Sequence, residues 1–140
     1  MNHRLIDVAL GNSPADLVIK SGKLVNVITK EIYDTDIAVA DGKIAAVGYI
    51  QEGAIGPDTK IVDAKGKYMT PGFIDAHIHF ESSMLTMTEF SKMAIKHGTT
   101  GIASDLMEIA IVAGREGIEA IFDEVKDLPV KLHYPVPAFM

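Results

Sequence analysis

Two histidines, His77 and His79, stand one residue apart in a segment that also carries Asp75 and Glu81 at the same spacing. Apolar residues occupy the positions between them, and a period of two is typical of a β-strand, whose successive side chains point to opposite faces. On such a strand the two histidines would project from one face with Cα atoms about 6.6 Å apart. Both imidazoles could then reach one cation, which binds histidine nitrogen at about 2.0–2.1 Å. The spacing therefore predicts a metal site with His77 and His79 as ligands.

The same alternation has a simpler explanation, because any half-exposed antiparallel strand alternates polar and apolar residues, and paired histidines can sit idle on its wet face. Three features favour the metal site: Pro71-Gly72 opens the segment, Ser82-Ser83 closes it, and each polar position between them holds a ligand type. The sequence contains no cysteine, which excludes thiolate metal sites, disulfides and a cysteine nucleophile together. Any metal must therefore be held by histidine and carboxylate side chains.

Composition and charge narrow the class of protein. The chain has 140 residues, 48% of them hydrophobic and 23% charged, which suits a globular protein of one ordinary domain or two small ones. The net charge of −6 and the lack of a basic cluster argue against nucleic-acid and membrane-surface partners. The N-terminal segment lacks the apolar stretch of a signal peptide, and no apolar run approaches the roughly 20 residues of a membrane span. We therefore expect a cytoplasmic protein.

Residues 1–69 predict a small β-rich domain that carries no chemistry. A short helix is expected over Arg4–Leu10, followed by apolar runs that turn residues interrupt. Asp41-Gly42 joins two of these runs, and an Asp-Gly pair in that position is a strong hairpin signal. We expect a β-sandwich-like domain or an open barrel, with a loop over Gln51–Lys60. The expected strands are Asp16–Lys20 before a turn at Ser21-Gly22, then Leu24–Ile28, Ile37–Ala40, Ile44–Val47, and Ile61–Asp63 and Lys67–Met69 around a turn at Gly66.

Residues 70–140 predict the order β-α-β-α-β, which implies a parallel sheet with right-handed crossovers. The strand with the histidines leads to Thr86 and Glu89, which have the spacing of a capping box at a helix start. Gly98 is placed to end that helix. The remaining expected elements are a strand over Thr99–Ser104, an amphipathic helix over Glu116–Lys126 and a strand over Val130–Val136.

In folds of this kind the functional site lies at the carboxyl ends of the parallel strands. The histidine pair falls at that end of the first strand. Asp105-Leu106-Met107-Glu108 and Tyr134–Met140 fall at the matching ends of the next two. Asp105 and Glu108 are therefore candidates for the site, although each could equally be a solvated loop charge.

Several segments resemble a known family. "DAKGKYMTPGFIDAHIH" is similar to the junction between the small β domain and the first barrel strand of the amidohydrolase superfamily. "HIHFESSMLTMTEF", "HGTTGIASD" and the N-terminal segment resemble the adenine deaminase family of bacteria and archaea. The HxH strand marks only the superfamily, whereas the ESSMLT extension and the N-terminal segment point to the deaminases. The likeness covers nearly the whole chain.

The resemblance implies a (β/α)₈ barrel with a divalent metal centre, usually binuclear, in which Mn²⁺ or Fe²⁺ is favoured and Zn²⁺ is the alternative. It gives metal-ligand roles to His77 and His79, and it implies hydrolysis of adenine to hypoxanthine and ammonia by a homo-oligomer. The main acid or base is expected beyond residue 140. Candidates for contacting the substrate or supporting the ligands are Asp75, Glu81, Ser82, Asp105, Met107 and Glu108.

Two departures from the family leave alternatives open. The family usually has Asp-Pro-His-Glu where this chain has Asp105-Leu106-Met107-Glu108, so another purine or a cyclic amide is a plausible substrate. A complete barrel needs eight strand–helix units and about 250 residues, whereas three strands are expected here. We therefore expect the N-terminal part of a larger enzyme, inactive on its own. The alternatives are a dihydroorotase-like or hydantoinase-like hydrolase and a non-catalytic remnant of the fold.

Overall fold

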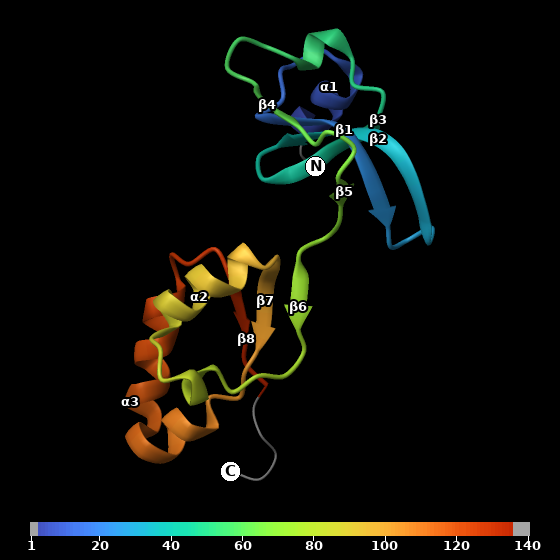
Figure 1. Cartoon of the computed structure of the whole chain (residues 1–140). Coiled ribbons are helices and arrows are strands. Elements are labelled where there is room, and N and C mark those ends of the chain that lie inside the picture. Colours follow the sequence, from blue (N-terminus) through green and yellow to red (C-terminus); the bar gives the residue numbers. More distant parts are fainter. Residues whose placement is uncertain (1–2, 136–140) are drawn as a thin grey trace. The chain divides into compact units, whose positions relative to one another are not determined.

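The computed structural model describes residues 3–135 of the chain. The chain divides into two compact units, Met1–Pro71 and Gly72–Met140, and each is described by itself (Figure 1). None of the helices described in residues 3–135 is long and apolar enough to cross a membrane.

One mixed sheet forms the N-terminal unit. Its strand order is β3-β2-β1-β4, and β5 also pairs with β1. The β1–β2 and β2–β3 pairs are antiparallel, whereas β4 and β5 run parallel to β1. The elements are α1 (His3–Leu10), β1 (Leu17–Asn26), β2 (Glu31–Ala40), β3 (Lys43–Gly48), the 3₁₀ helix η1 (Glu52–Ala54), β4 (Lys60–Asp63) and β5 (Tyr68–Met69).

Of the two turns discussed for this unit, the structure confirms one and contradicts the other. The Asp41-Gly42 hairpin is confirmed: both residues have positive φ, 51° and 68°, as a tight turn that follows the twist of its strands requires. The turn predicted at Ser21-Gly22 is wrong, because β1 continues through it. The pairing register shifts between Ile19 and Gly22, and the Ser21 N–H donates to Asp36 Oδ1 at 2.8 Å. The extra residue is absorbed as a β-bulge, which leaves the strand intact.

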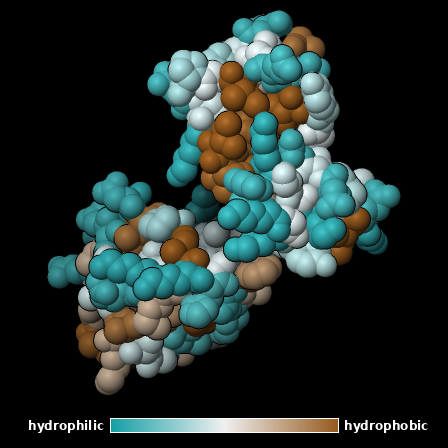
Figure 2. All heavy atoms as spheres, turned by 45° about the horizontal axis from the view of Figure 1, so that its top comes forward, coloured by the Kyte–Doolittle hydropathy of each residue, from teal (hydrophilic) through white to brown (hydrophobic). Residues whose placement is uncertain are grey.

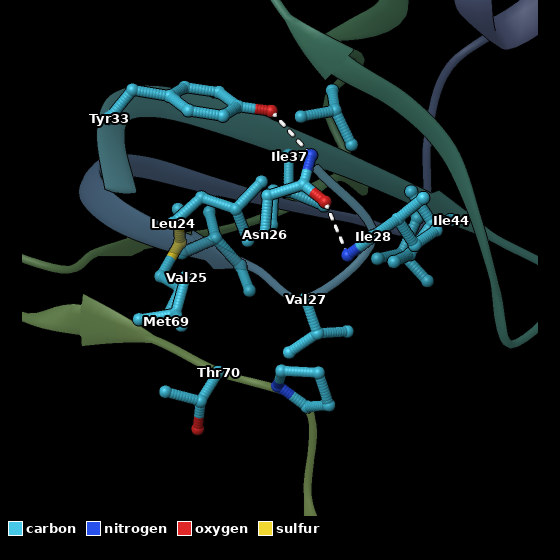
Figure 3. Close-up of a pocket in the computed structure, with 14 residues that line it drawn as sticks. Leu24, Val25, Asn26, Val27, Ile28, Tyr33, Ile37, Ile44, Met69 and Thr70 are labelled. Carbon is cyan, nitrogen blue, oxygen red and sulfur yellow. Dashed lines mark hydrogen bonds between the residues drawn. The ribbon is translucent and has the colours of Figure 1, made fainter. Parts of the chain in front are cut away.

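The two faces of this sheet differ. Val18, Ala38 and Ala40 on one face are buried against Val8 of α1. Their strand neighbours Ile19, Ile37 and Val39 must point to the opposite face, which carries an apolar groove of about 450 Å³ (Figures 2 and 3). The polar atoms of Asn26 at this groove are satisfied, because its amide donates to the Tyr33 hydroxyl at 3.0 Å and accepts from the Ile28 N–H at 3.0 Å (Figure 3). The described residues of this unit therefore form one sheet covered by a helix on one side, without the second sheet of a sandwich.

A parallel three-stranded sheet forms the C-terminal unit, as predicted, with strand order β6-β7-β8. Its core contains Phe80, Met87, Ile102, Leu106 and Val130. The elements are β6 (Phe73–Asp75), the 3₁₀ helix η2 (Phe80–Ser83), α2 (Met87–Lys96), β7 (Thr99–Ala103), α3 (Met107–Val125) and β8 (Lys131–His133).

The start of α2 confirms the predicted N-cap. The Thr86 hydroxyl accepts the Glu89 N–H at 3.3 Å. Among the described residues, the Glu89 carboxylate pairs with Lys92 at 2.5 Å instead of completing a capping box. After α2 the chain turns at Gly98, whose φ of 87° suits a glycine that ends a helix.

The strand predicted to carry the histidines is shorter than the alternation suggested. β6 ends at Asp75, whose Oδ1 accepts the His77 N–H at 3.1 Å and so bends the chain away from the strand. The expected strand does not extend to Phe80, which is 2% exposed and lies in η2, whereas Ile74 in β6 is 64% exposed. Burial of Phe80 in the core favours a compact 3₁₀ turn over further extended chain.

The second helix is longer than predicted. α3 begins at Met107 instead of Glu116, and it bends at Gly114, where φ is 58° and ψ is −151°. A helix interior does not adopt this conformation, so the glycine separates two helical stretches. The third strand is also shorter than expected and ends at His133, and residues 136–140 of the predicted strand and site segment lie outside the described residues.

Candidate metal centre

The two predicted ligands converge, although neither lies in a strand. His77 and His79 follow β6, and their Nε2 atoms are 3.2 Å apart with ring centroids separated by 5.0 Å. Two nitrogens that bind one metal ion at about 2.1 Å lie about 3.0–3.4 Å apart when the nitrogen–metal–nitrogen angle is between 90° and the tetrahedral value. The observed separation falls within that interval. The pair therefore has the geometry of two imidazoles that share one cation.

A carboxylate from a distant part of the sequence holds the other nitrogen of His79. Glu108, in the first turn of α3, places Oε2 2.9 Å from His79 Nδ1. This contact raises the pKa of His79, because the carboxylate stabilises a proton on Nδ1. With the proton held there, the lone pair of a neutral ring lies on Nε2, facing His77. Metal-binding histidines are commonly oriented by such a carboxylate on the second nitrogen.

Asp105 completes the first of two overlapping clusters. It lies just after β7, is 7% exposed, and places Oδ1 3.5 Å from His79 Nδ1. His77, His79 and Asp105 each offer a donor atom, and these atoms all lie within 4.8 Å of one another. Imidazole nitrogen with carboxylate oxygen suits Mn²⁺, Fe²⁺ and Zn²⁺.

Glu81 belongs to the second cluster, with His79 and Glu108. Both of its carboxylate oxygens are buried, and no donor among the described residues reaches either one. Burial raises the pKa of Glu81, and the neighbouring Glu108 raises it further. The contact with His79 instead lowers the pKa of Glu108. Two carboxylates packed together with one imidazole leave negative charge that a cation would neutralise. The donor set therefore fits a divalent metal.

The other predicted site residues have different positions. Asp75 forms the turn after β6 and does not belong to either cluster. Ser82 is exposed in η2, where its N–H donates to the His79 carbonyl at 3.1 Å. Met107 is half-buried as the first residue of α3, and its N–H donates to Asp105 Oδ1 at 3.2 Å. Met107 therefore lies beside the clusters, at the start of a helix.

Leu106 is a residue of this site that the sequence did not indicate. It is fully buried, yet its backbone is left-handed, with φ 52° and ψ 32°. A left-handed conformation costs a residue with a Cβ atom roughly 1–2 kcal/mol, and glycine or asparagine usually takes it. A leucine carries no sequence signal for such a turn, so nothing in the residue type could have revealed it.

Comparison with known proteins places the chain in a family. The model of the amidohydrolase family matches residues 68–140, just over half of the chain. An adenine deaminase of Moorella thermoacetica is 46% identical over 138 residues, which are 99% of this chain and 23% of that protein. The chain thus spans about a quarter of the length of the curated relatives it matches.

Two solved structures share the fold. N-acyl-D-glutamate deacylase from Bordetella bronchiseptica, complexed with zinc and a phosphonate inhibitor, is 28% identical with a TM-score of 0.55. The match covers 66% of this chain and 19% of the deacylase. A D-aminoacylase described for its binuclear metal centre is 26% identical with a TM-score of 0.53, covering 65% of this chain and 18% of that protein. Together with the family match, these likenesses show that the chain belongs to the amidohydrolase family.

Proposed function

We propose that the chain is the N-terminal part of a metal-dependent hydrolase that deaminates adenine to hypoxanthine and ammonia. The observation that carries this proposal is the convergence of His77 and His79 beside Asp105, Glu81 and Glu108. The 46% identity to an adenine deaminase over 99% of the chain supports the choice of substrate. We call the polypeptide that has the full length of such relatives the complete enzyme.

In this proposal His77 and His79 hold a divalent cation through Nε2, and Asp105 adds a carboxylate oxygen. A bound cation would supply Lewis acidity, the chemistry that activation of water for attack on the ring carbon bearing the amine requires. Glu108 keeps the Nδ1 proton of His79 in place and so fixes the tautomer that binds metal. Neutral imidazoles leave the charge of the cation undiminished, which preserves its acidity. Mn²⁺ or Fe²⁺ is the proposed metal, Zn²⁺ the alternative, with two ions in the complete enzyme.

The fold proposal matches this assignment. β6, β7 and β8 with α2 and α3 would be the first units of a (β/α)₈ barrel that begins near residue 70, after a small β-rich domain over residues 1–69. The site then lies where barrel enzymes carry it, after the carboxyl ends of strands. A cytoplasmic homo-oligomer that binds a small purine, without nucleic-acid or membrane partners, stays a prediction.

Product analysis tests the function. The complete enzyme, loaded with Mn²⁺, is expected to release ammonia and hypoxanthine from adenine, whereas the 140-residue chain alone is expected to release none. The chain alone lacks the remaining strands and therefore an enclosed substrate pocket. Ammonia release by the chain alone would refute its dependence on the missing part, and an inactive complete enzyme with full metal content would refute the adenine assignment.

A hydrolase that opens a cyclic amide is the second candidate. It is favoured by the structural likeness to a deacylase, an enzyme that cleaves an amide. Incubation of the same enzyme with dihydropyrimidines and hydantoins distinguishes the two, because ring opening creates a carboxylate and consumes base. Formation of a new carboxylate without ammonia release from adenine would establish this alternative.

Met107 offers a test of substrate choice. The resembling family usually has histidine at this position, and Met107 is half-buried next to Asp105. Met107→His in the complete enzyme is expected to change the ratio of kcat/KM between adenine and other purines by about threefold or more, because specificity is a difference in transition-state binding. Metal content should stay unchanged. An unchanged ratio with a lowered Tm would show instead that Met107 only fills space in the core.

A further inference from the structure

We propose that Leu106 is a positioning residue that holds Asp105 and Glu108 on the same side of the chain, against His79 Nδ1. The inference rests on the proposed metal function only where Mn²⁺ binding is measured. The positions of Asp105 and Glu108 against His79 can be observed without a metal. The proposal concerns a residue that neither binds a cation nor faces substrate.

The path of the backbone gives the first step. β7 ends at Ala103 and α3 begins at Met107, so only three residues connect the strand to the helix. This short connection must place Asp105 near the imidazole of His79, and Glu108 in the first turn of the helix must contact the same imidazole. Leu106, the one residue between Asp105 and the helix, has a left-handed conformation and so makes a local turn in the chain.

Contacts on both sides of Leu106 maintain this turn. Before it, Asp105 Oδ1 accepts the Met107 N–H at 3.2 Å. After it, the Leu106 carbonyl accepts the Ala110 N–H at 2.8 Å, which is the first hydrogen bond of α3. The carboxylate that faces His79 is therefore linked to the helix start that carries Glu108, and Leu106 lies between the two.

The side chain explains why a leucine stands where glycine would fit without strain. Leu106 is 0% exposed and packs in the same core as Phe80, Ile102 and Val130. Phe80 directly follows His79, and Ile102 lies in β7, so this core also supports the segments that carry the site. Burial of Leu106 anchors the turn and offsets the unfavourable backbone conformation.

Two substitutions separate the turn from the packing. Leu106→Ala and Leu106→Gly both remove the buried side chain, but only glycine adopts a left-handed conformation freely. In the complete enzyme, Mn²⁺ measured by calorimetry is expected to bind Leu106→Ala about tenfold more weakly than the parent, the scale on which supporting contacts act. Leu106→Gly should bind it within about threefold of the parent, although its Tm falls.

Val130→Ala is the matched control, because Val130 is 1% exposed in the same core and has no left-handed backbone. It should lower the Tm without changing the Mn²⁺ affinity. If Leu106→Ala binds Mn²⁺ as tightly as Leu106→Gly, the positioning role is refuted, because the affinity would not depend on the turn. If Val130→Ala weakens binding as much as Leu106→Ala, the role is also refuted, because the affinity would follow stability alone.

Crystal structures of the metal-free variants give a readout that does not depend on the proposed function. The separation of 2.9 Å between His79 Nδ1 and Glu108 Oε2 should persist in Leu106→Gly and be lost in Leu106→Ala. Retention of that contact in Leu106→Ala would overturn the inference. If the parent binds no Mn²⁺ while the contact behaves as expected, the metal function fails and the positioning role stands.

Discussion

Replacing His79 by alanine in the complete enzyme is expected to remove most of the bound divalent metal and to lower adenine turnover by more than about 100-fold. Loss of a supporting residue typically costs 10–100-fold, and His79 is proposed as a ligand itself. His79 also belongs to both clusters and contacts Asp105 and Glu108, so its removal takes a donor from each cluster. His77→Ala should also lower metal content and turnover, although Asp105 and Glu108 still contact His79 in that variant.

Metal content by mass spectrometry, alongside ammonia release, measures this outcome. His97→Ala is the matched control, because His97 is an exposed histidine at the end of α2 and belongs to neither cluster. It should retain metal and turnover. If the His77 and His79 variants both kept the parental metal content and rate, the assignment of the ligands would be wrong.

Glu81→Gln is expected to have opposite effects on stability and on metal binding. In the metal-free protein, no donor among residues 3–135 reaches the buried carboxylate oxygens of Glu81, and the neighbouring Glu108 carboxylate repels them. Neutralising Glu81 removes this repulsion and supplies an amide that can donate to Glu108, so the free energy of unfolding should rise by about 1 kcal/mol. The same change removes negative charge from the site, and Mn²⁺ should therefore bind about tenfold more weakly.

Chemical denaturation without metal and calorimetry with Mn²⁺ test the two signs separately. Glu116→Gln is the control, since Glu116 is an exposed carboxylate of α3 that belongs to neither cluster. It should change neither quantity appreciably. A Glu81→Gln variant that lost stability in the absence of metal, with unchanged Mn²⁺ affinity, would show that Glu81 has a structural role instead.

Features that depend on neighbouring residues could be predicted from the sequence. The hairpin at Asp41-Gly42 and the cap at Thr86 are local, because the residues that specify each turn also form it. The βαβαβ order of the C-terminal unit follows from the alternation of apolar patterns. The convergence of His77 and His79 was predicted too, although the strand used to argue it ends at Asp75. Their role as metal ligands stays a prediction.

Features that depend on distant contacts were decided by the tertiary structure. The sequence offered Asp105 and Glu108 as candidates, but only the pairing of β6 with β7 and the turn before α3 bring Glu108 to His79, 29 residues away. Burial of Phe80 places the end of the alternating segment in a 3₁₀ helix, and pairing along β1 converts Ser21-Gly22 from a turn into a bulge. Local preference accounts for turns and caps because their energies arise within a few residues. Core burial and strand pairing supply larger energies over long separations, and they set where strands end and where a leucine accepts a left-handed turn.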